Sequence, residues 1–343
     1  MLPLTVAVIR LYKPRIRKGK SQDVSLWKGG FMRSFKSVLM LACFGWPFMV
    51  LLCQDVNADP GTEKAKTVGE LAARYDVSTC KECHEEIYGQ WEASAHSKSM
   101  FGIGARTAAT IGTTITKGLM TWPYSGVEKP EDVKLKHLML CAKCHLPQLE
   151  EATDDVAQEI VKAVFGLWDK EIKKESVEKL RKININCLIC HQRKAITHKW
   201  AQGFPQRDAV YGTQEGGHED EKYPIMKKSE ILRESIFCGQ CHGLGPNFEF
   251  EEPSQCPTAY GSYLFAYIPE GGHETCQSCH MKKLNKGHVL PAYRDPDMAE
   301  AAVRFEVDAF GYYWRKNKLE GVIPLAVVRV EMTNKTGHGI PDG

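Results

Sequence analysis

The chain has little excess charge of either sign once its N-terminal segment is set aside. Its 343 residues include 45 Lys and Arg against 42 Asp and Glu, a formal net charge of +3. Residues 1–58 hold nine of the basic and two of the acidic side chains, so residues 59–343 carry 36 basic and 40 acidic ones, a net charge of −4. A nucleic-acid-binding surface needs a clear positive surplus. Nucleic acid is therefore excluded as an expected partner.

The sequence also lacks a hydrophobic run long enough to cross a membrane as a helix. Residues 38–53 form an apolar run of 16 residues, whereas a spanning helix needs roughly 20. Basic residues precede this run and small residues follow it, which is the pattern of an export signal. We therefore predict a start at Met32, residues 1–31 as an extension, cleavage after Ala58 and a periplasmic or extracellular location. Lipidation of Cys53 is the alternative, but no small residue precedes it.

Cysteine, by contrast, is abundant and regularly placed. Ten of the 13 cysteines fall into five Cys-x-x-Cys-His motifs, at Cys80–His84, Cys141–His145, Cys187–His191, Cys238–His242 and Cys276–His280. Many cysteines in a small exported protein usually indicate disulfides, and paired Cys-x-x-Cys motifs can bind zinc. Neither explanation accounts for a histidine directly after every pair.

The Cys-x-x-Cys-His motif is the attachment signature of a c-type haem. Both thiols add to the porphyrin, and the adjacent imidazole binds the iron as proximal ligand. We therefore predict five covalently attached haem c groups. The attachment residues are Cys80, Cys83, Cys141, Cys144, Cys187, Cys190, Cys238, Cys241, Cys276 and Cys279. The proximal iron ligands are His84, His145, His191, His242 and His280.

Residues around the motifs resemble a known family. The first motif is followed by Tyr88, Trp91, Ser94 and His96, as in the opening repeat of cytochrome c-554-type multihaem proteins. Residues 237–242, 263, 276–281 and 288 resemble the later part of larger multihaem c cytochromes, and residues 334–343 resemble their C-terminal motif. This resemblance implies haems with two histidine ligands and stacked in pairs. The family includes electron carriers, respiratory-chain subunits and a few enzymes. The Cys-x-x-Cys-Lys site of ammonifying nitrite reductases is missing.

Seven further histidines compete for the second, distal position on five irons. The resemblance implies this role for His96 and His288. His137 lies too close to Cys141 to reach its own haem, so we expect it to serve a neighbouring one, and His198 is similarly placed after His191. His218, His273 and His338 compete for the fifth position. We favour His218 because it lies in a long stretch between two motifs.

The expected fold is mainly α with much irregular loop, wrapped round a chain of five haems, with a short β segment at the C-terminus. We expect little conventional core. Helices are predicted at residues 67–75, 87–95, 148–182 and 296–318, the third with an apolar stripe packed on a haem. Residues 101–126 are predicted as loop and residues 201–229 as irregular. The predicted domains are residues 1–58 (extension and signal), 59–318 (the five-haem domain) and 319–343 (a β segment that pairs with another chain or begins a further domain).

The expected function is electron transfer through the five haems in an exported respiratory chain, because irons with two histidine ligands cannot bind substrate. The expected partners are other redox proteins, such as cytochromes or a quinol-linked reductase, with membrane contact only by association. An acidic surface suits a basic redox partner. Two alternatives stay open: an oxidoreductase with one open haem acting on a small nitrogen or sulfur compound, and a self-assembling subunit of an extracellular cytochrome filament.

Overall fold

The structure, a computed structural model, describes residues 7–8, 63–101, 106–196, 203–243, 246–247, 254–255, 258–315, 317–319 and 321–340. They fall into two compact units. The larger comprises Glu63–Glu306 and Met332–Gly343, and the smaller comprises Val307–Glu331 and the N-terminal residues Met1–Thr62, of which strand β1 (Ala7–Val8) is described. The predicted export signal lies outside the described residues. No helix in these ranges has the length and apolar character needed to cross a membrane.

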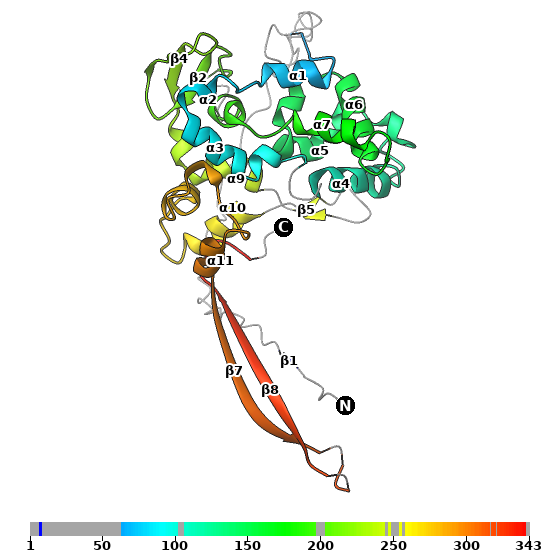
Figure 1. Cartoon of the computed structure of the whole chain (residues 1–343), viewed down its shortest axis with the longest axis vertical. Coiled ribbons are helices and arrows are strands. Elements are labelled where there is room, and N and C mark those ends of the chain that lie inside the picture. Colours follow the sequence, from blue (N-terminus) through cyan, green and yellow to red (C-terminus); the bar gives the residue numbers. More distant parts are fainter. Residues whose placement is uncertain are drawn as a thin grey trace, which may run out of the picture. The chain divides into compact units, whose positions relative to one another are not determined.

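The larger unit is mostly helical (Figure 1). Its α-helices are α1 (Val68–Arg74), α2 (Cys80–Cys83), α3 (Glu85–Ala93), α4 (Arg106–Thr113), α5 (Leu135–His145), α6 (Asp154–Gly166), α7 (Lys173–Arg181), α9 (Ser235–His242), α10 (Ala259–Ser262) and α11 (Pro296–Ala302). Short 3₁₀ segments are η1 (His96–Lys98), η3 (Pro130–Asp132), η4 (Pro147–Glu151), η6 (Glu230–Arg233) and η9 (Gly287–Val289). Segments η2 (Thr114–Leu119), η5 (Ile189–Arg193), η7 (Tyr263–Tyr267) and η8 (Ser278–Lys282) are π-helical.

Strands are few in this unit. β2 (Ala209–Gly212), β4 (Ile225–Lys228) and β3 (Gly216–Gly217) form a small mixed sheet in that order, with β2 parallel and β3 antiparallel to β4. β5 (Pro246–Asn247) pairs with β6 (Ser254–Gln255). The prediction of an irregular segment over residues 201–229 therefore missed the small sheet.

Local sequence signals explain where α1 begins. The Thr67 hydroxyl accepts a hydrogen bond from the backbone N–H of Glu70 at 3.0 Å, and the Glu70 carboxylate accepts one from the N–H of Lys66 at 2.7 Å. The first bond satisfies an N–H group that the first helical turn leaves unpaired, and the second holds the residue before the cap. The helix predicted over residues 67–75 is confirmed, and α3 confirms most of the helix predicted over residues 87–95.

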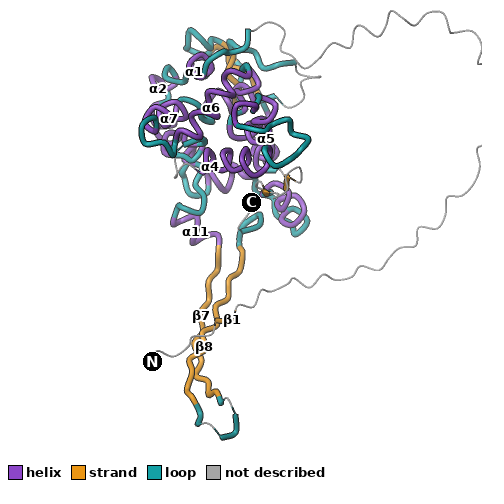
Figure 2. Tube along the Cα trace, turned by 90° about the vertical axis from the view of Figure 1, so that its right-hand side faces the viewer, coloured by secondary structure: helices purple, strands orange, loops and turns teal. Residues whose placement is uncertain are grey.

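A conventional core is present, contrary to expectation. Helix α6 lies among α1, α4, α5 and α7 (Figure 2) and buries Ile160, Val161 and Val164 completely or nearly so. These residues belong to a continuous cluster of buried apolar side chains. The stripe predicted to pack on a haem therefore packs in this core, where each fully buried side chain contributes about 1.5–3 kcal/mol to stability.

The single helix predicted over residues 148–182 is wrong. The chain ends α6 at Gly166 and folds α7 back against it. A Cβ atom at Gly166 would lie 2.3 Å from the hydroxyl of Ser176 and 2.9 Å from Ile172 Cδ1. Glycine is thus required here because the two helices approach too closely for a side chain.

The loop predicted over residues 101–126 is also wrong, because α4 and η2 occupy much of it. Ala108, Ile111 and Ile115 recur at helical spacing and are buried in the core. Gly112 fits on the same helix, since a Cβ there would be 3.4 Å from a methyl group of Val164. Gly112 therefore lies within α4 and does not break the helix.

The C-terminal β structure is longer than predicted. α11 ends at Ala302 and strand β7 (Val303–Trp314) follows, so the helix predicted over residues 296–318 is wrong beyond its first turns. β7 pairs with β8 (Ile323–Asn334), whose other neighbour is β1. Asp308 and Arg329 form an ion pair across the two long strands. Alternating aromatic and β-branched residues favour extended structure over helix.

Candidate functional site

Each Cys-x-x-Cys-His motif lies on or beside one turn of helix. The first occupies α2 and His84, the second and fourth end α5 and α9, and the third and fifth run into π-helical turns η5 and η8. One helical turn brings residues three and four apart to the same side, so both thiols and the imidazole of a motif can meet one ligand. None of the ten motif cysteines, all of which lie in the described part of the chain, forms a disulfide.

Four motif histidines face a histidine from a distant part of the chain. His84 faces His218 with ring centres 6.2 Å apart, and His280 faces His338, also at 6.2 Å. His242 faces His96 at 6.2 Å, and His191 faces His288 at 6.3 Å. The angles between ring planes are 10° for His84 and His218, 13° for His280 and His338, 32° for His191 and His288, and 89° for His96 and His242.

These separations fit an iron between two imidazoles. An imidazole–metal bond is about 2 Å long. Two such bonds, added to the distance from each nitrogen to its ring centre, place the ring centres roughly 6 Å apart. Direct ring stacking would bring the two centres closer. The repeated spacing in four independent pairs therefore matches the donor set of a haem with two histidine ligands.

Backbone carbonyls fix the orientation of four of these rings. Nδ1 of His191 bonds to the carbonyl of Tyr211, that of His218 to Tyr223 and that of His280 to Pro291, each at 2.8 Å. Nδ1 of His338 bonds to its neighbour Gly339 at 2.9 Å. A carbonyl accepts only from an N–H, so the proton is on Nδ1 and the lone pair of Nε2 is available for a metal.

The partner histidines are held by contacts with remote segments. The carbonyl of His96 accepts from the N–H of Ile185 at 3.2 Å, and the N–H of His288 donates to the side chain of Gln90 on α3 at 2.9 Å. Gly287 leaves room for this contact, because a Cβ there would lie 2.1 Å from the Gln90 oxygen. The protein thus uses backbone positions, as well as the rings, to fix where each imidazole lies.

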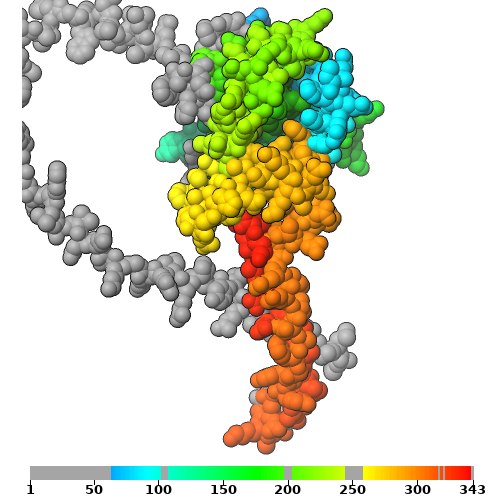
Figure 3. All heavy atoms as spheres, turned by 90° about the vertical axis from the view of Figure 1, so that its left-hand side faces the viewer, coloured from blue at the N-terminus to red at the C-terminus, as the bar shows by residue number. Residues whose placement is uncertain are grey.

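His338 lies in a tight turn after β8. Asn334 donates from its side chain to the carbonyl of His338 at 2.7 Å and accepts from the N–H of Thr336 at 2.9 Å. The N–H of Gly339 donates to the hydroxyl of Ser262 at 3.1 Å. Figure 3 shows the red C-terminal segment lying against orange and yellow residues of the larger unit. The Asn-x-Thr-Gly-His sequence forms the turn that fixes the position of His338.

Burial favours the neutral, metal-binding form of several of these histidines. Burial, together with repulsion from His242 and His145, lowers the pKa of His96 to about 4. Burial is also the main cause of the lowered pKa of His191, His145 and His288. A metal competes with a proton for imidazole nitrogen, so a lowered pKa favours ligation.

The remaining candidates are placed differently. Nδ1 of His137 accepts a hydrogen bond from the N–H of Lys134 at 2.9 Å, and its Nε2 is buried without a partner in the described part of the chain. This bond keeps the proton on Nε2 and opposes iron binding there. His273 is exposed. His198 lies outside the described residues, and among those described no imidazole ring is paired with His145.

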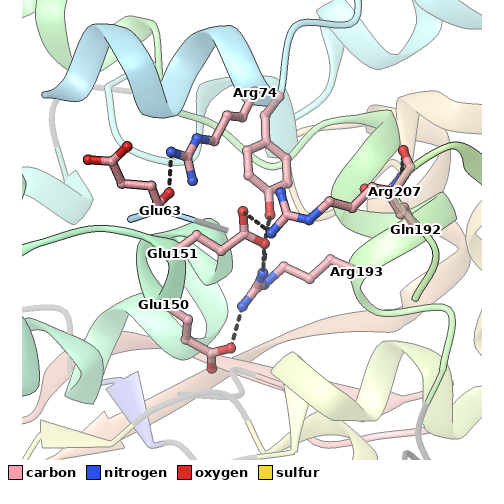
Figure 4. Close-up of polar contacts among 8 residues, drawn as sticks. Glu63, Arg74, Glu150, Glu151, Gln192, Arg193 and Arg207 are labelled. Carbon is pink, nitrogen blue, oxygen red and sulfur yellow. Dashed lines mark hydrogen bonds and ion pairs between the residues drawn. The ribbon is translucent and has the colours of Figure 1, made fainter. Parts of the chain in front are cut away.

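A polar cluster, missed by the sequence reasoning, connects the segments that follow the second and third motifs (Figure 4). Arg193 on η5 donates to Glu151 on η4 at 2.6 Å, to Tyr75 at 3.1 Å and also to Glu150. Tyr75 donates to Glu151 at 2.8 Å. Burial raises the pKa of Tyr75, so the hydroxyl remains a donor. The cluster fixes η5, and with it His191, relative to α1 and η4.

One family matches part of the chain. Residues 79–166, which include the first two motifs, match the model of the family described as cytochrome c554 and c-prime. Comparisons with curated proteins and with solved structures gave no match. The match implies covalently bound haem c and electron transfer. The chain is thus a c-type cytochrome that resembles the cytochrome c554 family over residues 79–166.

Proposed function

We propose that the chain binds five haem c groups and transfers electrons among them, with at least four of the irons bound by two histidines. When bound, each haem supplies an iron that accepts and releases one electron. The ten motif cysteines would attach the haems, and His84, His145, His191, His242 and His280 would be the proximal ligands. The observation that carries the proposal is the set of four facing histidine pairs.

In this proposal the protein's own carbonyl groups tune three of the four paired sites, those of the first, third and fifth motifs. Carbonyl acceptors on Nδ1 of His191, His218, His280 and His338 hold each ring and increase its basicity. A second imidazole on each iron leaves no position for a substrate. Four irons that each bind two imidazoles would suit electron transfer and exclude direct chemistry at the iron.

The distal assignments follow the pairs. We assign His218 to the first motif, His288 to the third, His96 to the fourth and His338 to the fifth. His338 was one of three candidates for the fifth distal position, and the sequence alone did not favour it. His198 remains a proposed distal ligand, and we now propose it for the second motif, because His145 has no paired imidazole among the described residues. We no longer assign His137, because its hydrogen bond places the proton on the nitrogen that would have to bind iron.

The proposed location and partners of the protein rest on the sequence alone. We propose an exported, periplasmic or extracellular protein that works in a respiratory chain. The acidic balance of residues 59–343 supports a basic redox protein as partner, since opposite charges accelerate encounter. Haem propionates would add further negative charge to the loaded protein.

A second candidate function is an oxidoreductase with one open iron. The specific observation in its favour is His145, which has no paired imidazole among the described residues. If His198 does not reach this site, a small nitrogen or sulfur compound could bind the iron of the second motif. The two candidates therefore differ in one ligand.

The proposal can be tested by counting haems and electrons. Intact-mass spectrometry of the exported protein should show one chain carrying five covalent haems. A spectroscopic redox titration with small mediators should then take up five electrons per chain. Fewer than five haems on the purified, fully matured protein would contradict the proposal.

A further inference from the structure

Cysteines of different motifs lie side by side. The thiols of Cys80 and Cys187, of Cys144 and Cys241, and of Cys238 and Cys276 lie within interaction distance of each other. Cys190 interacts electrostatically with Cys241. The fourth motif, Cys238–His242, thus adjoins three others: the second and third through Cys241, and the fifth through Cys238.

Hydrogen bonds outside the thiols fix the contacts of the fourth motif with the third and fifth. Gln240, inside the fourth motif, donates from its side chain to the carbonyl of Lys194 at 3.0 Å, three residues after His191. Gln277, inside the fifth motif, donates to the carbonyl of Glu234 at 2.9 Å, directly before α9. The N–H of Cys276 donates to the hydroxyl of Ser235 at 3.2 Å.

The contact with the second motif is supported by helix packing and by the imidazoles. Helices α5 and α9, which end in the second and fourth motifs, pack against each other. His145 interacts electrostatically with His242 and with its partner His96. Ser99, next to the segment that holds His96, donates to the carbonyl of His145 at 3.2 Å.

The first motif is bound to the third in a similar way. The indole N–H of Trp91 on α3 donates to the carbonyl of Ile185 at 2.8 Å, two residues before Cys187. Gln90 on the same helix holds His288, the partner of His191. These contacts agree with the neighbouring sulfurs of Cys80 and Cys187.

We propose that the fourth motif is a branch point, where the haem bound to Cys238 and Cys241 adjoins those of the second, third and fifth motifs. The reason is covalent: each motif sulfur is bonded to the edge of its haem, so neighbouring sulfurs bring haem edges together. The first haem joins the branch through the third. This inference rests on the proposed function and gives the chain three ends at which electrons can enter or leave.

Iron positions test the branch directly. Diffraction data recorded at the iron absorption edge from crystals of the haem-loaded full chain locate each iron beside its proximal histidine. We expect the iron at His242 to have three neighbours, at His145, His191 and His280, and the iron at His84 to have one, at His191. A linear order of five irons overturns the branch and leaves the proposed function intact. Fewer than five irons contradicts the proposed function itself.

A solution experiment gives an independent readout. Replacing histidine by methionine on an iron raises its reduction potential. The altered haem is then reduced earlier in the titration, and its changed charge shifts the reduction potentials of the adjacent haems. In a redox titration followed by electron paramagnetic resonance (EPR), His96→Met should shift the transitions of three other haems. The matched control, His338→Met, alters a haem at the end of an arm and should shift one. Equal numbers of shifted transitions in the two variants overturn the branch.

Discussion

The imidazole of His338 faces that of His280 at 6.2 Å, with ring planes 13° apart, and both rings bond through Nδ1 to backbone carbonyls. A turn around Asn334 holds His338 in place. A hydrogen bond from Gly339 to Ser262 fixes this turn against the rest of the larger unit. In the proposed function this pairing favours His338 over the exposed His273 as the distal ligand of the fifth motif.

Removing His338 should therefore open one iron. In His338→Ala we expect one low-spin haem to become high-spin, with a raised reduction potential, because a strong-field imidazole is lost. Visible absorption and EPR of the oxidised protein measure the change. The matched control His273→Ala should keep the parent spectrum. A fully low-spin His338→Ala protein would show that His338 is not a ligand.

The perpendicular pair should have its own spectroscopic signature. His96 and His242 have ring planes 89° apart, whereas His84 and His218 are within 10° of parallel. The angle between axial imidazole planes sets the splitting of the iron d orbitals. We expect one strongly anisotropic low-spin EPR signal, which should disappear in His96→Ala and persist in His218→Ala. Loss of this signal in His218→Ala instead would reverse the assignment.

Gln90 and Gly287 should position His288. Gly287 has a φ of +54° and lies against Gln90. In Gly287→Ala, strain and the clash should lower the free energy of unfolding by more than about 1 kcal/mol and weaken ligation at the haem of His191. Denaturation and the low-spin EPR signal measure the two effects. Gly89→Ala, on the helix beside Gln90, is the control, since nothing lies within 4 Å of its Cβ and alanine favours a helix interior.

The ion cluster around Arg193 should be needed for stability. Arg193→Met leaves Glu150, Glu151 and Tyr75 without their shared donor. Removing one partner of a largely buried ion pair costs about 3 kcal/mol, which chemical denaturation of the haem-loaded protein can measure. The exposed pair of Lys66 and Glu63 provides the control, because Lys66→Met should change stability little. Similar losses in the two variants would contradict this role for Arg193.

The sequence predicts local features of this protein well and long-range ones poorly. The motif cysteines and their histidines lie within five residues of each other, so their spacing alone is enough to predict their roles. Partner histidines are remote in sequence, and His218 and His338 could not both be assigned when His137 was counted as a ligand. The hydrogen bond that sets the His137 tautomer depends on the start of α5 and has no sequence signature.

The wrong predictions of helices and loops have a similar origin. Gly112 was interpreted from composition as a loop residue and Gly166 was overlooked, whereas Gly112 lies within α4 against Val164 and Gly166 allows α7 to approach α6 closely. The segment 303–314 was predicted as part of a helix, but its aromatic and β-branched residues form a strand. In each case the decisive partner lies elsewhere in the chain: Ser176 for Gly166, Val164 for Gly112 and β8 for β7.

The most direct test of the central claim is low-temperature EPR of the fully oxidised protein with its haem content quantified. The account predicts four low-spin ferric haems, one for each facing histidine pair, in the parent protein. The haem of His145 then distinguishes the two candidate functions. A fifth low-spin signal that disappears in His198→Ala would support an electron carrier. A high-spin signal from this haem that shifts with nitrite or cyanide supports the enzyme. Two or more high-spin haems in the parent protein would contradict the paired-histidine account.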